Sequence, residues 1–466
     1  MHSYVSVIPR FPVEIQEHVV DSLARPMLLI AAQVSKTWYS LVMPKFYSTV
    51  ELTSRKKYDL LVAQLRTSPR VKRWLLTTRE VIITARDSSQ FAAQRYTSFM
   101  DVFPFVFATA LPSLRRLELH HGLELLAHPS FVLALRGFRT VTSLSLAHSK
   151  FDDVASMHRI VSAFSRMETL TLTAIATKHL NEVSSWARGR GRLPRLKTLQ
   201  LMYMNEKTLL IFIPWLIDSG ICTSLQNLMI ALESHLGRVY NTGSECGRQI
   251  SRLLEVCGPA LTAFDEVAGY MKSRGKFCHE DDGHAHEGIA LPGYPHCNLS
   301  HNTELISLRL YLHVNLEFDA TLFNRPSSED TRQRWLSAAK MLREDLSTVR
   351  SHRLEHLTIH LSVTLSGIFG APDSRVFPQR FFTSHTESAL HDAMARPYFD
   401  ALKRVDVVLN IQYNDVMRIV WEKYVPRAVE PVVHDMFRPW INRDTLEYSQ
   451  ALRCYRSRAT FFTSRR

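Results

Sequence analysis

The chain has 466 residues, of which 45% are hydrophobic and 22% charged, a composition typical of globular proteins and not of disordered chains. Its six cysteines have no regular spacing, and no apolar stretch reaches the length of a membrane span, so we expect reduced thiols in a cytoplasmic or nuclear protein. The formal net charge is +13, but we expect the basic residues to fall in separate loops and near the C-terminal end instead of along one helical stripe, which argues against a nucleic-acid-binding protein.

The first 50 residues predict three short helices. In residues 11–23 apolar side chains recur at the spacing of one helical face, and Pro12 suits a first helical turn. A second short helix is expected near 28–32, and a third near 34–42. Three helices in about 35 residues bury too little apolar surface to be stable alone. We therefore expect them to pack on a larger domain.

The same stretch resembles the F-box, the adaptor-binding motif of SCF-type ubiquitin ligases. The F-box opens with Leu-Pro-x-Glu-Leu/Ile, and this chain has Phe11-Pro12-Val13-Glu14-Ile15. It departs from the family at two places. Phe11 replaces the usual Leu, and Ala24-Arg25-Pro26 stands where an acidic residue often follows the position of Leu23. An ordinary three-helix cap on a larger domain is the alternative. The resemblance implies contact with a Skp-type adaptor through Pro12, Ile15, Val19, Leu23, Leu28, Val34 and Trp38.

A six-residue phrase, apolar-x-x-apolar-x-apolar, then recurs along the chain. It begins at Leu114, Val141, Met167, Leu196 and Leu225, at steps of 27, 26, 29 and 29 residues, and again at Leu305, Leu354 and Leu402. A degenerate copy is expected at Leu261, Phe264 and Val267, and residues 46–52 are expected to form the first strand. The alternating end of each phrase predicts a strand, and the segments between phrases, such as 153–164 and 208–217, predict helices.

Strand-plus-helix units of this length resemble leucine-rich repeats. The expected fold is therefore α/β: a three-helix F-box at 8–45, then an irregular leucine-rich-repeat solenoid at 46–430 with a curved parallel sheet and helices on its convex side. A loop insertion is expected at 269–301, and a C-terminal helical cap and basic tail at 431–466. A doubly wound α/β domain would also alternate strands and helices, but it would rarely keep one phrase at near-constant spacing.

The residues between the apolar positions of each phrase are expected to line the concave face of the sheet and to bind a protein substrate. This face is nearly neutral, which argues against a phosphate-binding groove. The same residues could equally be solvated strand positions. The candidates are Arg116, Glu118, His120, Thr171, Gln200, Arg309, Tyr311, His356 and His360.

Residues 269–301 interrupt the repeat with several histidines and two cysteines, including Cys278 and Cys297. These are zinc-ligand residue types, but no CxxC or HxxxH pair is present, and the segment has the composition of an exposed loop. We expect no metal, no cofactor and no catalytic residue in this chain.

The resemblances together imply a non-enzymatic substrate receptor, in which the F-box binds the adaptor and, through it, a cullin, while the repeats select a protein for ubiquitination. Neither nucleic acid nor membrane is an expected partner. The alternative is a leucine-rich-repeat scaffold or sensor outside any ligase.

Overall fold

The computed structural model describes residues 12–84, 99–121, 129–177, 194–204, 206–232, 245–267, 297–317, 328–366, 384–414, 429–443 and 446–455. The chain divides into two compact units, Met1–Pro194 and Arg195–Arg466, and each is described by itself below. None of the helices in the described ranges is long and apolar enough to cross a membrane.

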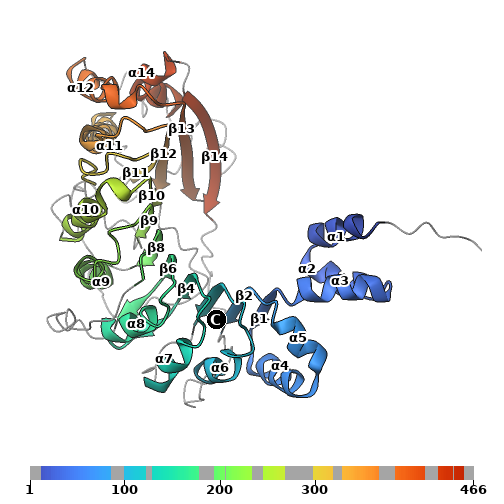
Figure 1. Ribbon diagram of the computed structural model, residues 1–466. Helices are drawn as coiled ribbons and strands as arrows, with labels where there is room; N and C mark the ends of the chain where they lie inside the picture. Colours follow the sequence, from blue (N-terminus) through green and yellow to red (C-terminus); the bar gives the residue numbers. More distant parts are fainter. Residues whose placement is uncertain are drawn as a thin grey trace, which may run out of the picture. The chain divides into compact units, whose positions relative to one another are not determined.

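The first unit opens with the three predicted short helices, α1 (Val13–Ser22), α2 (Arg25–Ala31) and α3 (Lys36–Phe46) (Figure 1). Pro12 precedes α1, and α2 has a proline in its first turn, where the missing backbone N–H costs nothing. The Ser35 hydroxyl accepts a hydrogen bond from the Trp38 amide and caps α3 at 3.3 Å. Each helix thus begins at a local sequence signal.

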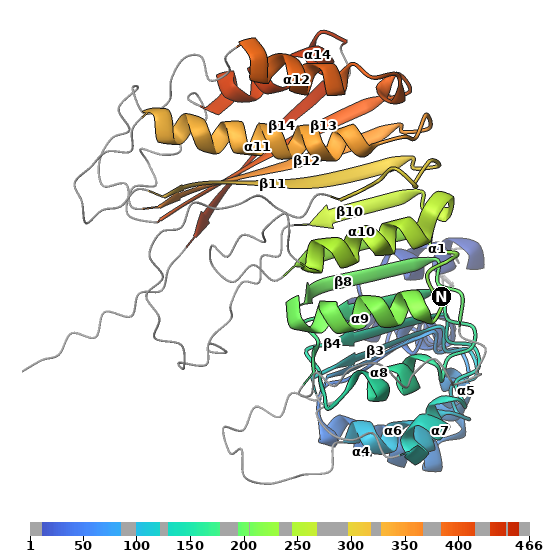
Figure 2. The ribbon, with the colours of Figure 1, turned by 90° about the vertical axis from the view of Figure 1, so that its left-hand side faces the viewer.

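A parallel sheet follows, and its strands pair in chain order. Figures 1 and 2 show the helices of this unit along one face of these strands. The strands are β1 (Thr49–Leu52), β2 (Glu80–Thr84), β3 (Arg116–His120), β4 (Ser143–Ala147) and β6 (Thr169–Thr173); the helices are α4 (Arg55–Thr67), α5 (Pro69–Leu75), α6 (Phe99–Phe107), α7 (Pro129–Leu135) and α8 (Val154–Val161). Two short strands, β5 (Lys150–Phe151) and β7 (Ala176–Thr177), pair separately.

The second unit repeats this arrangement with longer strands. Its strands also pair in parallel, with successive neighbours in register from β8 to β14. They are β8 (Thr198–Met204), β9 (Asn227–Leu232), β10 (Ala263–Val267), β11 (Ser307–Glu317), β12 (His356–Ser366), β13 (Arg404–Asn414) and β14 (Leu446–Tyr455). Helices connect these strands, and α9 to α12 lie along one face (Figure 2). The helices are α9 (Glu206–Asp218), α10 (Glu245–Cys257), α11 (Ser328–Thr348), α12 (Ser384–Met394), 429–436 and α14 (Arg438–Ile441), with one-turn 3₁₀ helices at Gly258–Ala260 and Pro397–Phe399.

The apolar phrase builds the core of both units, as predicted. Its second and third positions, such as Leu117 and Leu119 in β3, are at most 2% exposed. Neighbouring strands place these positions opposite one another, so that Leu117 pairs with Leu144 and Leu144 with Leu170. The mixed α/β class with a parallel sheet is therefore confirmed.

The expected strand at 46–52 starts later than predicted. Helix α3 continues through Phe46, and β1 covers only Thr49–Leu52. Strand β2 carries no complete apolar phrase because Thr78 stands in its first position; this residue is fully buried, and its hydroxyl donates to the Tyr47 carbonyl at 2.8 Å. A hydrogen bond there replaces the expected apolar contact.

The predicted copy at Leu261, Phe264 and Val267 is wrong in its last position. Phe264 pairs with Leu228, and the next inward row pairs Glu266 with Ile230. Ile230 is 2% exposed, so Glu266 takes the place of a core residue, and Val267 pairs with Ala231 one position beyond it.

The segment 431–466 is only partly the expected helical cap and tail. Helices at 429–436 and Arg438–Ile441 are present, but Leu446–Tyr455 forms β14, which pairs with β13 over ten positions. The apolar phrase could not be recognised at this strand because Arg443 stands in its first position. Residues 456–466 lie outside the described part of the chain.

Candidate functional site

The three N-terminal helices form a small core of their own. Val20, Leu28, Ala31 and Val42 are buried at its centre. Leu23 and Trp38, both predicted adaptor contacts, pack against this centre and are partly buried, whereas Leu28 is only 3% exposed. These three residues therefore hold the helices together, and Leu28 offers no surface to a partner.

The outer side of α1, α2 and the turn after it is apolar and exposed. Of the predicted contacts, Ile15 is 50%, Val19 38% and Val34 68% exposed, and Pro12 is exposed as well. Twelve large hydrophobic residues are exposed in the described part of the chain, and seven of them lie between positions 13 and 34. We call this set the apolar surface: Val13, Ile15, Val19, Met27, Leu29, Ile30 and Val34.

Four members of the apolar surface were absent from the sequence prediction: Val13 in α1, and Met27, Leu29 and Ile30 in α2. Helix α2 points Leu28 and Ala31 inward at i and i+3, so its remaining apolar residues must face outward. A helix that is apolar on every side is normally covered on every side. This rule could have identified the three residues of α2 from the sequence. The run Met27–Ala31 is apolar throughout, so a second protein surface is needed to cover the side of the helix that faces away from the core.

The helices join the sheet through aromatic and ionic contacts. The Trp74 ring of α5 stacks on Tyr47 with centroids 5.3 Å apart and meets the edge of Tyr39 at 5.7 Å. Arg25 forms an ion pair with Glu51, donates to the Thr49 carbonyl at 2.7 Å and lies over the Phe46 ring. Because only two residues separate α3 from β1, these contacts leave the helices no flexible linker.

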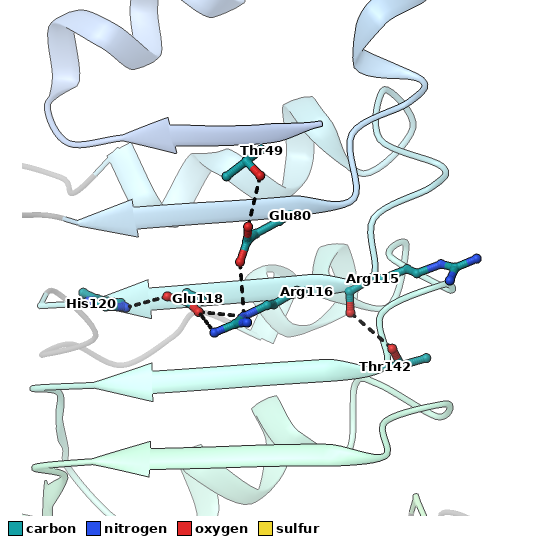
Figure 3. A network of polar contacts seen from close by, with 7 residues as sticks. All are labelled: Thr49, Glu80, Arg115, Arg116, Glu118, His120 and Thr142. Carbon is teal, nitrogen blue, oxygen red and sulfur yellow. Dashed lines mark hydrogen bonds and ion pairs between the residues drawn. The ribbon is translucent and has the colours of Figure 1, made fainter. Parts of the chain in front are cut away.

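In the first unit the predicted substrate residues Arg116, Glu118 and His120 form one network across the strands (Figure 3). Arg116 lies 3.2 Å from the Glu80 carboxylate and donates to Glu118 at 2.7 Å. His120 lies 3.2 Å from the second Glu118 oxygen. The hydrogen bond from His120, together with the charge of Arg116, lowers the pKa of Glu118 below its ordinary value. This carboxylate therefore stays ionised and fixes both of its neighbours.

Thr171 belongs to the same face, two strands from Glu118. Strand register pairs Glu118 with Ser145, and Ser145 with Thr171. The row thus passes from an ion-paired carboxylate to two small hydroxyl-bearing side chains. A partner would meet fixed charges at one end of this row and hydroxyl groups at the other.

In the second unit, strand register places the remaining predicted residues in neighbouring rows. Gln200 pairs with Met229, which pairs with Asp265, which pairs with Arg309; the Arg309 guanidinium lies 3.1 Å from the Asp265 carboxylate. Tyr311 pairs with His360 in the next row of this face. Tyr311 is only 8% exposed, so it contributes little free surface. His356 is exposed and lies 4.0 Å from Glu355.

The segment 269–301 lies mostly outside the described residues, including Cys278. Cys297 is described and is buried, and burial raises the pKa of its thiol well above the ordinary value. Burial also raises the pKa of Cys246 and Cys257 to about 12. Among the described residues, no three His, Cys, Asp or Glu side chains are placed to hold a metal ion. These thiols are protonated core residues.

No protein-family model matches the chain, and no curated protein matches its sequence. The functional interpretation of the apolar surface and of the polar sheet faces therefore depends on the residues themselves.

Proposed function

We propose that the chain is the substrate-recognition subunit of an SCF-type ubiquitin ligase, in which the three N-terminal helices bind a Skp-type adaptor. The observation that carries this proposal is the apolar surface on α1 and α2. It exposes seven large hydrophobic side chains while the same helices keep a separate, complete core. Exposed apolar residues concentrated in so short a segment indicate a protein-binding site.

The rest of the chain would serve as a leucine-rich-repeat solenoid that holds the substrate. Support comes from parallel strands in chain order, a buried apolar phrase in most of them, and helices along one face within each unit. Fixed charges at Glu80, Arg116 and Glu118 and at Asp265 and Arg309 would then select a complementary protein surface. Ubiquitin transfer would be performed by partner enzymes in the cytoplasm or nucleus.

The test is co-expression with a Skp-type adaptor. The double variant Ile15→Asp, Ile30→Asp places charges on the apolar surface without touching the buried centre. Truncating an apolar interface anchor typically costs about 2 kcal/mol or more, so we expect adaptor affinity to fall at least about 30-fold. The matched control is Leu133→Asp, which changes a side chain on α7 that is 60% exposed.

The melting temperature of each variant shows whether folding is intact. Equal adaptor binding by the wild-type chain and the double variant would overturn the proposal. A wild-type chain that forms no adaptor complex at all would favour the second candidate, a leucine-rich-repeat scaffold outside a ligase.

A further inference from the structure

Helices α4 and α5 carry a dense group of positive charges that the proposed function does not use. Between positions 55 and 73 seven lysines and arginines stand against one acid, Asp59. Asp59 is already engaged by Arg55 at 3.0 Å. We call the other six the basic surface: Lys56, Lys57, Arg66, Arg70, Lys72 and Arg73.

The basic surface is exposed and unneutralised. All six side chains are exposed, and none forms an ion pair with a described residue. The two helices pack against each other (Figure 1) and are joined only by Ser68, so Arg66 near the end of α4 and Arg70 at the start of α5 are four residues apart. At 1.5 Å per residue, the 13 residues of α4 give the surface a length of about 20 Å.

Half of these cations lie where they oppose helix stability, whereas Arg66, Lys72 and Arg73 lie in last turns, where positive charge is favoured. Lys56 and Lys57 lie in the first turn of α4, and Arg70 lies in the first turn of α5. A helix N-terminus carries a partial positive charge, which favours acidic residues and disfavours basic ones. Neither first turn contains an acid. Lys56, Lys57 and Arg70 are therefore kept where the local structure would be more stable without their charge, which favours binding of an anion-bearing partner.

The chemistry of the surroundings identifies the class of partner. Two large apolar side chains are exposed on the same segment, Leu60 in α4 at 58% and Leu76 directly after α5 at 43%, and a phosphate backbone offers nothing to cover them. Single-stranded nucleic acid also needs free aromatic rings for base stacking. The aromatic residues of α4 and α5 are Tyr58, which is 4% exposed, and Trp74, which is engaged by Tyr47 and Tyr39.

We propose that the basic surface of α4 and α5 binds an acidic segment of a protein partner, one that alternates carboxylates with apolar residues. An extended segment of about six residues would span the surface at roughly 3.3 Å per residue. Its carboxylates would pair with the six cations and its apolar side chains would cover Leu60 and Leu76. The inference does not depend on adaptor binding, because the apolar surface lies on other helices.

The test uses a fluorescent peptide in which glutamate and leucine residues alternate. A single-stranded DNA oligomer and phosphatidylserine vesicles serve as competing probes. The variant Arg70→Glu, Lys72→Glu, Arg73→Glu should weaken peptide binding at least tenfold. A matched control, Arg136→Glu, Arg139→Glu, Arg166→Glu, makes the same charge change at exposed arginines elsewhere in this unit and should weaken it less than about twofold. Raising the salt concentration should weaken the wild-type complex.

A second variant separates binding from folding. Lys56→Glu, Lys57→Glu adds acids to the first turn of α4, so it should raise the melting temperature while it weakens peptide binding. Equal losses in the test and control variants would overturn the proposal, since the effect would then be one of overall charge. Loss of DNA or vesicle binding with unchanged peptide binding would overturn it in favour of those partners.

Discussion

Glu266 places a carboxyl group in a row of the sheet that is otherwise apolar. Its neighbours across the strands are Ile230 and, by extension of the β10–β11 register, Leu310. Loss of hydration raises the pKa of Glu266 to about 8, and the nearby Asp345 carboxylate contributes in the same direction. The Tyr311 amide donates to the Glu266 carboxylate at 3.5 Å and opposes the shift only partly. Glu266 is therefore largely protonated at neutral pH.

This shift predicts a pH-dependent stability. Between the ordinary glutamate pKa and about 8, the folded chain holds a proton on Glu266 that the unfolded chain has lost. The free energy of unfolding should then fall as pH rises through this window, by up to roughly 1.4 kcal/mol per pH unit. Glu266→Gln keeps the shape of the side chain but has no ionisable group. It should therefore remove the pH dependence of the free energy of unfolding in denaturant titrations at pH 5 to 8. An unchanged slope in this variant would show that other groups govern it.

At the level of the strands, a recurring backbone feature follows three strands of the first unit. His121, His148 and Ala174 follow β3, β4 and β6 and have φ of 52°, 52° and 50°. This left-handed conformation costs a residue with a Cβ atom roughly 1–2 kcal/mol relative to glycine. The His121 and His148 rings stack with centroids 4.6 Å apart, which gives two of the three positions a contact that glycine could not make.

Ala174 has no such ring contact, so glycine should be better there. Ala174→Gly relieves the left-handed strain but loosens the unfolded chain, and we expect a net gain of about 0.5–1 kcal/mol. The control is Ala147→Gly at the end of β4, whose φ is not positive and whose side chain is 5% exposed. That change should destabilise. Thermal unfolding of both variants measures the difference, and a lower melting temperature for Ala174→Gly would contradict the expectation.

The strands that the sequence predicted are those whose first position is apolar. The apolar phrases that begin at Leu114, Val141 and Met167 correctly predict β3, β4 and β6, because their apolar positions are the ones that are buried. Strands β2 and β14 were hidden by Thr78 and Arg443, which break the phrase at a single position. No local pattern reveals that Thr78 finds the Tyr47 carbonyl, since the two are 31 residues apart.

The candidate sites divide in the same way. The periodicity of 11–23 put Ile15 and Val19 on the same helical face as the buried Val20, so it could not tell which apolar residues of these short helices point inward. The orientation of α2 is fixed by α1 and α3, so Met27, Leu29 and Ile30 emerged only with the packed helices. The charge network of Figure 3 likewise depends on strand register, which brings Glu80 beside Arg116.

At the scale of the whole molecule, the two proposed partner surfaces of the first unit differ in chemistry. The apolar surface offers seven large hydrophobic side chains, and the basic surface offers six cations. Their complexes should therefore respond differently to salt, because screening weakens charge pairing and leaves apolar contacts largely intact.

The short connection between α3 and β1 also limits the motion of the N-terminal helices. The Ser48 carbonyl accepts hydrogen bonds from the amides of Arg79 and Glu80 at 2.8 and 3.0 Å, so the second strand pins the residue that joins helices and sheet. A hinge there could open only by breaking these bonds. We expect the Arg79 and Glu80 amides to exchange with deuterium as slowly as those of Leu117 and Leu119 in the centre of the sheet. Exchange orders of magnitude faster would reveal a hinge. Slow exchange would mean that the N-terminal helices and the first strands move as one body for as long as the unit stays folded.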